Sequence, residues 1–184
     1  LHVSNGGILT IPLTQQLINV SIWAESGGAI SFPQLTSYAV PDWGYAIQAS
    51  GIGSYIDMPA LVSLTGATLQ AWDGATLTFT SLAEIIRVNM YANSGGVISF
   101  PGATTYTGSD YGTTIQAIGA GSRIDLSGLT SFTGGLYSFS SISTSSGGEV
   151  DLSGEISRTS LALDGADSVL DVSGVTKLTD ANLH

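Results

Sequence analysis

The chain has 184 residues, with 14 acidic against four basic side chains, a formal net charge of −10, and no cysteine. Disulfides and thiolate metal sites are therefore excluded. Nucleic acids and anionic membrane surfaces are disfavoured as partners, because both need a clustered basic surface. No apolar run is long enough to cross a bilayer, and the hydrophobic content of 43 % suffices for the core of a single domain.

A four-residue element recurs eight times along the chain. Its first and third residues are large and apolar, its second is Asp, Ser or Thr, and its fourth is Pro, Ser or Thr. This alternation predicts a short strand with one buried face, ended by a turn. In chain order the element occupies residues 9–12, 30–33, 56–59, 77–80, 98–101, 124–127, 150–153 and 170–173.

Two further apolar elements accompany it and predict two more short strands in each repeat. One precedes the four-residue element, at residues 1–3, 22–24, 47–49, 69–71, 90–92, 115–117, 142–144 and 161–163. The other follows it, at residues 35–38, 61–64, 82–85, 103–106, 129–132 and 175–178. Because the set returns every 20 to 26 residues with glycine-rich corners and no helical pattern between, it predicts eight coils of a solenoid.

A longer repeat is superimposed on the coils. Residues 20–66 match residues 88–134 at a constant offset of 68, with 25 of 47 positions identical. The offset spans three coils, so the higher unit is a triplet. We expect residues 1–184 to form one domain that is a segment of a longer repeat protein.

Three short strands per coil, inward apolar ladders and glycine at the corners resemble the right-handed parallel β-helix of pectin-lyase-like proteins and bacterial surface adhesins. The predicted fold is therefore an all-β solenoid, with its hand taken from the general rule for parallel crossovers. Coils about 4.8 Å apart would make a rod about 40 Å long, with Leu126 and Leu152 pointing into a common interior. A leucine-rich-repeat solenoid is the alternative, although no helical return is evident.

The second position of the four-residue element forms a predicted outward column that contains Asp125, Asp151 and Asp171 in successive coils. Stacked carboxylates repel one another unless a cation or a base lies between them. Calcium prefers such oxygen ligands and is the one candidate cofactor. Alternatively, the column is a surface ladder of ion pairs, because Arg123 and Glu149 occupy equivalent outward positions in neighbouring coils and are expected to pair.

Aromatic side chains are the candidate ligand-binding groups. Trp23 and Tyr91 occupy equivalent outward positions of the first strand, three coils or about 14 Å apart. Two longer loops carry the matching sequences PDWG and SDYG and supply the further candidates Asp42, Trp43, Asp110 and Tyr111. An aromatic face with a polar rim suits a sugar ring. The alternative is that Trp43 and Tyr111 only cover the corner of the core.

One coil departs from the pattern. If the register held, its third strand would point Glu155 and Arg158 inward. A buried ion pair must overcome a large desolvation cost, so we expect a register slip that turns Ile156 inward instead.

Catalytic signals are sparse, because His2 and His184 lie at opposite ends of the chain and the bases are dispersed. The predicted function is that of a structural or adhesive segment of a secreted or cell-surface bacterial protein, without enzymatic activity. Its expected partners are carbohydrate or another surface protein, together with self-association through exposed ends. A pectin-lyase-like enzyme that cleaves polysaccharide is the alternative function.

Overall fold

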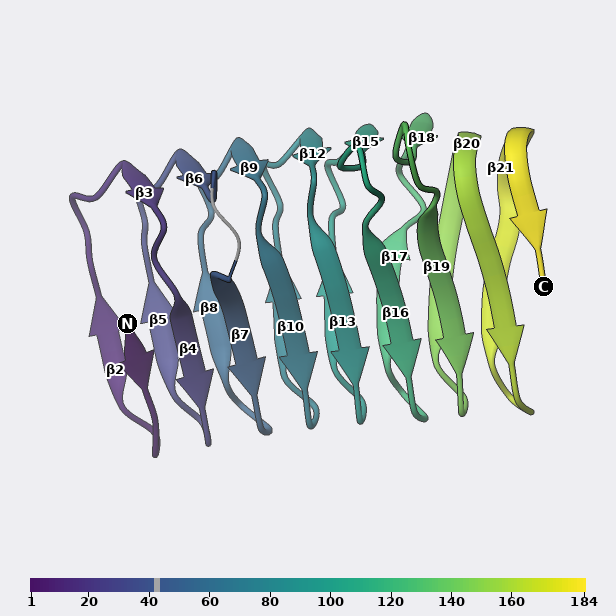
Figure 1. The fold of residues 1–184 in the computed structure, drawn as a ribbon. Coiled ribbons are helices and arrows are strands. Elements are labelled where there is room, and N and C mark those ends of the chain that lie inside the picture. The colour runs from purple at the N-terminus through teal and green to yellow at the C-terminus, as the bar shows by residue number, and fades with distance from the viewer. Residues whose placement is uncertain (42–43) are drawn as a thin grey trace.

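The structure, a computed structural model, describes residues 1–41 and 44–184. These residues form 21 β-strands and no helix. The strands wind into a rod of stacked coils with the two termini at opposite ends (Figure 1). Every strand pairing is parallel, and each strand pairs with its equivalent in the next coil. The predicted parallel β-solenoid of about eight coils is confirmed, and the leucine-rich-repeat alternative is wrong.

Three faces run along the rod, one for each strand of a coil. The first face consists of β1 (His2–Val3), β4 (Ile22–Glu25), β7 (Ala46–Ser50), β10 (Thr68–Trp72), β13 (Asn89–Asn93), β16 (Thr114–Ile118) and β19 (Ser140–Ser145). The second consists of β2 (Ile8–Thr10), β5 (Ala29–Ser31), β8 (Tyr55–Asp57), β11 (Thr76–Thr78), β14 (Val97–Ser99) and β17 (Arg123–Leu126).

The third face consists of β3 (Gln16–Ile18), β6 (Ser37–Ala39), β9 (Ser63–Thr65), β12 (Glu84–Ile86), β15 (Thr105–Thr107) and β18 (Ser131–Thr133). The long strand β20 (Glu149–Asp164) bends through all three faces, because it pairs in turn with β17, β18 and β19. The last strand, β21 (Val169–Leu183), follows β20.

The strand registers reproduce the alignment of the four-residue element. Its first residues pair in an unbroken column that comprises Leu9, Ile30, Ile56, Leu77, Ile98, Ile124, Val150 and Leu170. The third strands begin later than predicted, since β6 starts at Ser37 and not at Leu35. The backbone N–H of Leu35 donates to the Phe32 carbonyl, so Leu35 belongs to the turn, although its side chain is buried.

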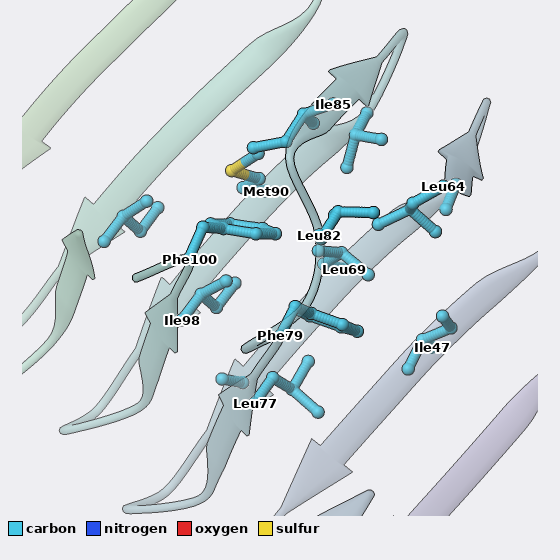
Figure 2. Close-up of a cluster of buried hydrophobic side chains, with 14 of the residues drawn as sticks. Ile47, Leu64, Leu69, Leu77, Phe79, Leu82, Ile85, Met90, Ile98 and Phe100 are labelled. Atoms are coloured by element: carbon cyan, nitrogen blue, oxygen red, sulfur yellow. The ribbon is translucent and has the colours of Figure 1, made fainter. Parts of the chain in front are cut away.

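The interior of the rod is one continuous apolar cluster. Figure 2 shows side chains from all three faces converging in its central coils. Phe79 and Phe100 stack there, with ring centroids 5.3 Å apart. Leu126 and Leu152 are buried, as the predicted interior requires. Each coil therefore buries its apolar residues mainly against the coils before and after it.

Tight glycine corners join the first face to the second. At one of them Ser94 and Gly95 have φ angles of 52° and 82°, which place both in the left-handed region. A Cβ atom on the next residue, Gly96, would lie 1.8 Å from the carbonyl oxygen of Ala71 in the preceding coil. Only glycine allows the two coils to approach this closely.

The irregular coil follows the predicted register slip. Ile156 pairs with Phe132 and is buried, whereas Glu155 is exposed. The corner between the second and third faces is two residues shorter here than in the preceding coil, which lets β20 continue without interruption. The two charges therefore avoid the interior.

The corners between the third and first faces differ in length. Short corners occupy residues 19–21, 66–67 and 87–88, whereas six residues separate the strands at 40–45, 108–113 and 134–139. Along the rod their order is short, long, short, short, long, long. Two short corners thus lie between two long loops, an arrangement that shapes the candidate site described next.

Candidate functional site

The first face carries the predicted column of outward side chains. Trp23 pairs with Gln48, which is followed coil by coil by Gln70, Tyr91 and Gln116. Trp23 is 41 % exposed, and its ring lies edge-on to the ring of His2 at 6.2 Å. Trp23 and Tyr91 are therefore three coils apart on one face, as predicted. Within the described residues, no ring contact or hydrogen bond joins Trp23 or Tyr91 to Asp110 or Tyr111.

Trp72 is a further aromatic residue of this face that sequence reasoning missed. It ends β10 and pairs with Asn93, two positions beyond the pairing of Gln70 with Tyr91. Its side chain is half-buried, and within the described residues its indole nitrogen has no hydrogen-bond partner. The signal was available, because Trp72 follows the inward Ala71 in the same alternation.

Tyr111 and Tyr137, from neighbouring long loops, form what we call the tyrosine platform. Their ring centroids are 5.6 Å apart at an interplanar angle of 42°. The two residues are 76 % and 71 % exposed, so Tyr111 does not cover the core. The Tyr137 N–H donates to the Asp110 carbonyl at 2.7 Å and locks the loops together. The predicted partners Asp42 and Trp43 lie outside the described residues.

A buried hydrogen-bond network supports the tyrosine platform from below. The hydroxyl of Tyr106 donates to the Val88 carbonyl at 2.7 Å and lies 2.5 Å from the hydroxyl of Thr113. Thr113 in turn lies 3.0 Å from the hydroxyl of Ser140 at the end of the next loop. Burial raises the pKa of Tyr106, so its hydroxyl stays protonated. The platform is thus held on a fixed base and not on free loops.

Two hollows open beside the platform and share Arg87. The smaller, of about 80 Å³, is lined by Val40, Pro41, Gly66 and Arg87. The larger, which we call the recess, measures about 450 Å³ and is lined by Ile86, Arg87, Thr107, Gly108, Ser109, Asp110 and Tyr111.

The recess contains one base, one acid and one aromatic ring. Arg87, Asp110 and Tyr111 are all exposed. In the part of the chain that the structure describes, no ion pair or side-chain hydrogen bond engages Arg87 or Asp110. Sequence reasoning found Asp110 and Tyr111 from the duplicated loop but missed Arg87 and Tyr137. Arg87 and Tyr137 become candidates only through their position beside neighbouring coils. A single repeat of the sequence does not show that position.

The predicted carboxylate column is present on the second face. Asp125 pairs with Asp151, and Asp151 pairs with Asp171. The Arg123 guanidinium lies between the first two, 3.4 Å from Asp125 and in direct contact with Asp151, and its Nε lies 3.5 Å from Glu149. The predicted pairing of Arg123 with Glu149 is confirmed.

The carboxylates of this column have different environments. Asp151 is nearly buried, whereas Asp171 is exposed and accepts a hydrogen bond from the Ser173 N–H, which lowers its pKa. Burial, together with the charge of Asp151, raises the pKa of Glu149. Within residues 1–41 and 44–184, no three His, Asp or Glu side chains are grouped as a metal site requires. Calcium binding at this column remains a prediction.

No protein-family model, curated protein or solved structure matches the chain. The described residues also contain no helix that could cross a membrane.

Proposed function

We propose that the chain is an adhesive segment of a larger secreted or cell-surface protein and that it binds carbohydrate through the tyrosine platform. The observation that carries the proposal is the pair of exposed rings of Tyr111 and Tyr137 on a base of buried hydrogen bonds. Large apolar side chains that are exposed on a rigid support mark interaction sites. Leu136 and Phe139, exposed on the same loops, extend this patch.

Carbohydrate suits this surface better than a protein partner does. A sugar ring presents an apolar C–H face to an aromatic ring and hydroxyl groups to the polar rim. Here the rim includes the Asp110 carboxylate and the Arg87 guanidinium, both without partners in the described residues. On the first face, Gln48 and Gln70 lie between Trp23 and Tyr91, so a polymer has additional aromatic and amide groups to contact along the rod.

Of the two groups of proteins that the repeats resemble, bacterial surface adhesins fit the proposal better than pectin-lyase-like enzymes. The densest cluster of acids and base lies on the second face, where Arg123 is engaged by three carboxylates. A guanidinium held in this way is neutralised by its partners and serves to join coils. The platform and the recess offer groups that bind a ligand, without a histidine among the lining residues.

A glycan array tests the proposal, with the chain bearing Tyr111→Ala and Tyr137→Ala compared with the unmodified chain. We expect specific binding that the double variant loses. The control is Tyr55→Ala, because Tyr55 is 49 % exposed on the second face, away from the platform. No binding to any glycan would refute the proposal. Release of reducing ends or unsaturated products from a bound polysaccharide would favour the enzymatic alternative.

A further inference from the structure

We propose that the recess binds a neutral hexose unit, with Arg87 and Asp110 hydrogen-bonding its hydroxyl groups and Tyr111 packing against its ring. This inference rests on the proposed carbohydrate-binding function and names the ligand class. The recess lies wholly within the described residues. Its volume of about 450 Å³ falls in the range of roughly 300–1,000 Å³ that is usual for small-molecule sites.

Arg87 occupies an unusual place for a long side chain. Ile86 pairs with Thr65 on one side and Thr107 on the other, so Arg87 lies between Gly66 and Gly108 in the neighbouring coils. Neither neighbour has a side chain that could cover the guanidinium. The φ angle of Arg87 is 53°, in the left-handed region that glycine adopts without strain. The same conformation recurs in the equivalent short corners at Asn19 and Arg158, with φ angles of 53° and 55°, so it belongs to the corner itself and holds Arg87 in a fixed backbone geometry.

Asp110 and Tyr111 face the same recess from a loop that is fixed by its neighbour. The backbone carbonyl of Asp110 accepts hydrogen bonds from the N–H groups of Tyr137 and Ser138, at 2.7 and 3.4 Å. A Cβ atom on Gly112 would lie 2.5 Å from the carbonyl oxygen of Phe139, so the two loops are packed closely. The backbone of this loop is therefore held by hydrogen bonds and close packing. The Asp110 carboxylate stays exposed and without a partner among the described residues.

A guanidinium and a carboxylate that line the same recess, each without a partner in the part of the chain that the structure describes, together favour a ligand with hydroxyl groups. Arginine only donates hydrogen bonds and an ionised carboxylate only accepts them, whereas a sugar hydroxyl does both. Both interactions are charge-assisted and therefore strong. A planar ring such as that of Tyr111 adds an apolar surface for the C–H face of the sugar. These three groups together match a polyhydroxylated ring.

Charge favours a neutral sugar over an acidic one. The chain has a net charge of −10, and a polyanion approaching it is repelled at long range. Asp110 lines the recess itself, and Glu84 is exposed on β12, the strand that ends beside Arg87. A single arginine does not outweigh these charges. A neutral hexose gains both hydrogen bonds without this repulsion.

Isothermal titration with maltotriose, cellotriose, mannotriose and galactotriose tests the inference, with trigalacturonate as the acidic comparison. We expect at least one neutral trisaccharide to bind, and Arg87→Gly and Tyr111→Ala each to weaken it by about tenfold or more. Arg87→Gly suits the backbone, so its melting temperature should not fall. The matched control is Arg158→Gly, because Arg158 occupies the equivalent corner with a φ of 55° and lies outside the recess.

The possible outcomes separate the two proposals. Binding of a neutral trisaccharide that Arg87→Gly weakens by about tenfold or more and Arg158→Gly leaves within about twofold would support the recess. Glycan binding that depends on Tyr137 but is unchanged by Arg87→Gly would overturn the recess and leave the proposed function standing. Tighter binding of trigalacturonate than of every neutral sugar would overturn the ligand class. If no saccharide binds in the titrations or on the array, both proposals fall.

Discussion

Replacement of Phe100 by alanine tests the stacked interior directly. Phe100 is 1 % exposed, and its ring stacks on that of Phe79 at 5.3 Å with an interplanar angle of 14°. Removing a buried phenylalanine costs about 3–5 kcal/mol of unfolding free energy, of which the aromatic pair accounts for about 0.5–1.5 kcal/mol. Buried side chains of the same coil and of the preceding coil surround this ring (Figure 2), so collapse of the cavity is limited. We therefore expect a loss of about 4 kcal/mol.

Urea unfolding followed by circular dichroism measures this loss, with Phe139→Ala as the matched control. Phe139 is 39 % exposed in a loop, and its removal should cost less than about 1 kcal/mol. The double variant with Phe79→Ala isolates the energy of the aromatic pair. A loss below about 1.5 kcal/mol for Phe100→Ala would refute the description of a continuous close-packed column. Equal losses for Phe100→Ala and the control Phe139→Ala would refute it as well.

Three further outcomes concern the charged column. Arg123→Gln should lower the unfolding free energy by about 1–3 kcal/mol, because the Asp151 side chain, 8 % exposed, loses its cationic partner; urea titration at neutral pH measures this, and no change would contradict it. The pKa of Glu149 is raised in the folded chain above its ordinary value of 4.5. Its contribution to the unfolding free energy is therefore fully present below pH 4.5 and is lost as the pH rises through the raised pKa. Glu149→Gln should therefore gain stability relative to the unmodified chain across that rise, and parallel pH profiles would argue otherwise. We expect added Ca²⁺ to raise the melting temperature of the unmodified chain, and Asp171→Asn to reduce that increase. A melting temperature that neither Ca²⁺ nor a chelator changes would refute the predicted calcium site.

The coils and their registers were predictable because the fold is quasi-one-dimensional. When coils stack in register, residues one repeat apart become neighbours. An alignment of the repeats therefore predicts which residues pair between coils. The pairing of Trp23 with Gln48 and that of Arg123 with Glu149 followed in this way. The register slip that turns Ile156 inward was also predictable, since the alternative placed Glu155 and Arg158 in the interior.

The candidate site was only half predictable. The duplication at an offset of three coils pointed to Asp110 and Tyr111, because a repeated loop is visible in the sequence. Tyr137 was missed because its loop, at 134–139, has no counterpart in the first triplet. Its role depends on contact with the loop of the preceding coil. Arg87 was missed because a lone arginine carries no pattern of its own.

By itself, the sequence determined which side chains point inward and which stack in columns, because period-two alternation and the repeat length act locally and recur in every coil. Only the tertiary structure decided how exposed each of these side chains is and which side chains of other coils lie beside it. Corner lengths that differ between coils leave Arg87 open beside the tyrosine platform. The same stacking buries Asp151 against Arg123 and leaves Asp171, in the last coil, exposed. Burial depends on what lies on both sides of a coil, and no single repeat contains that information.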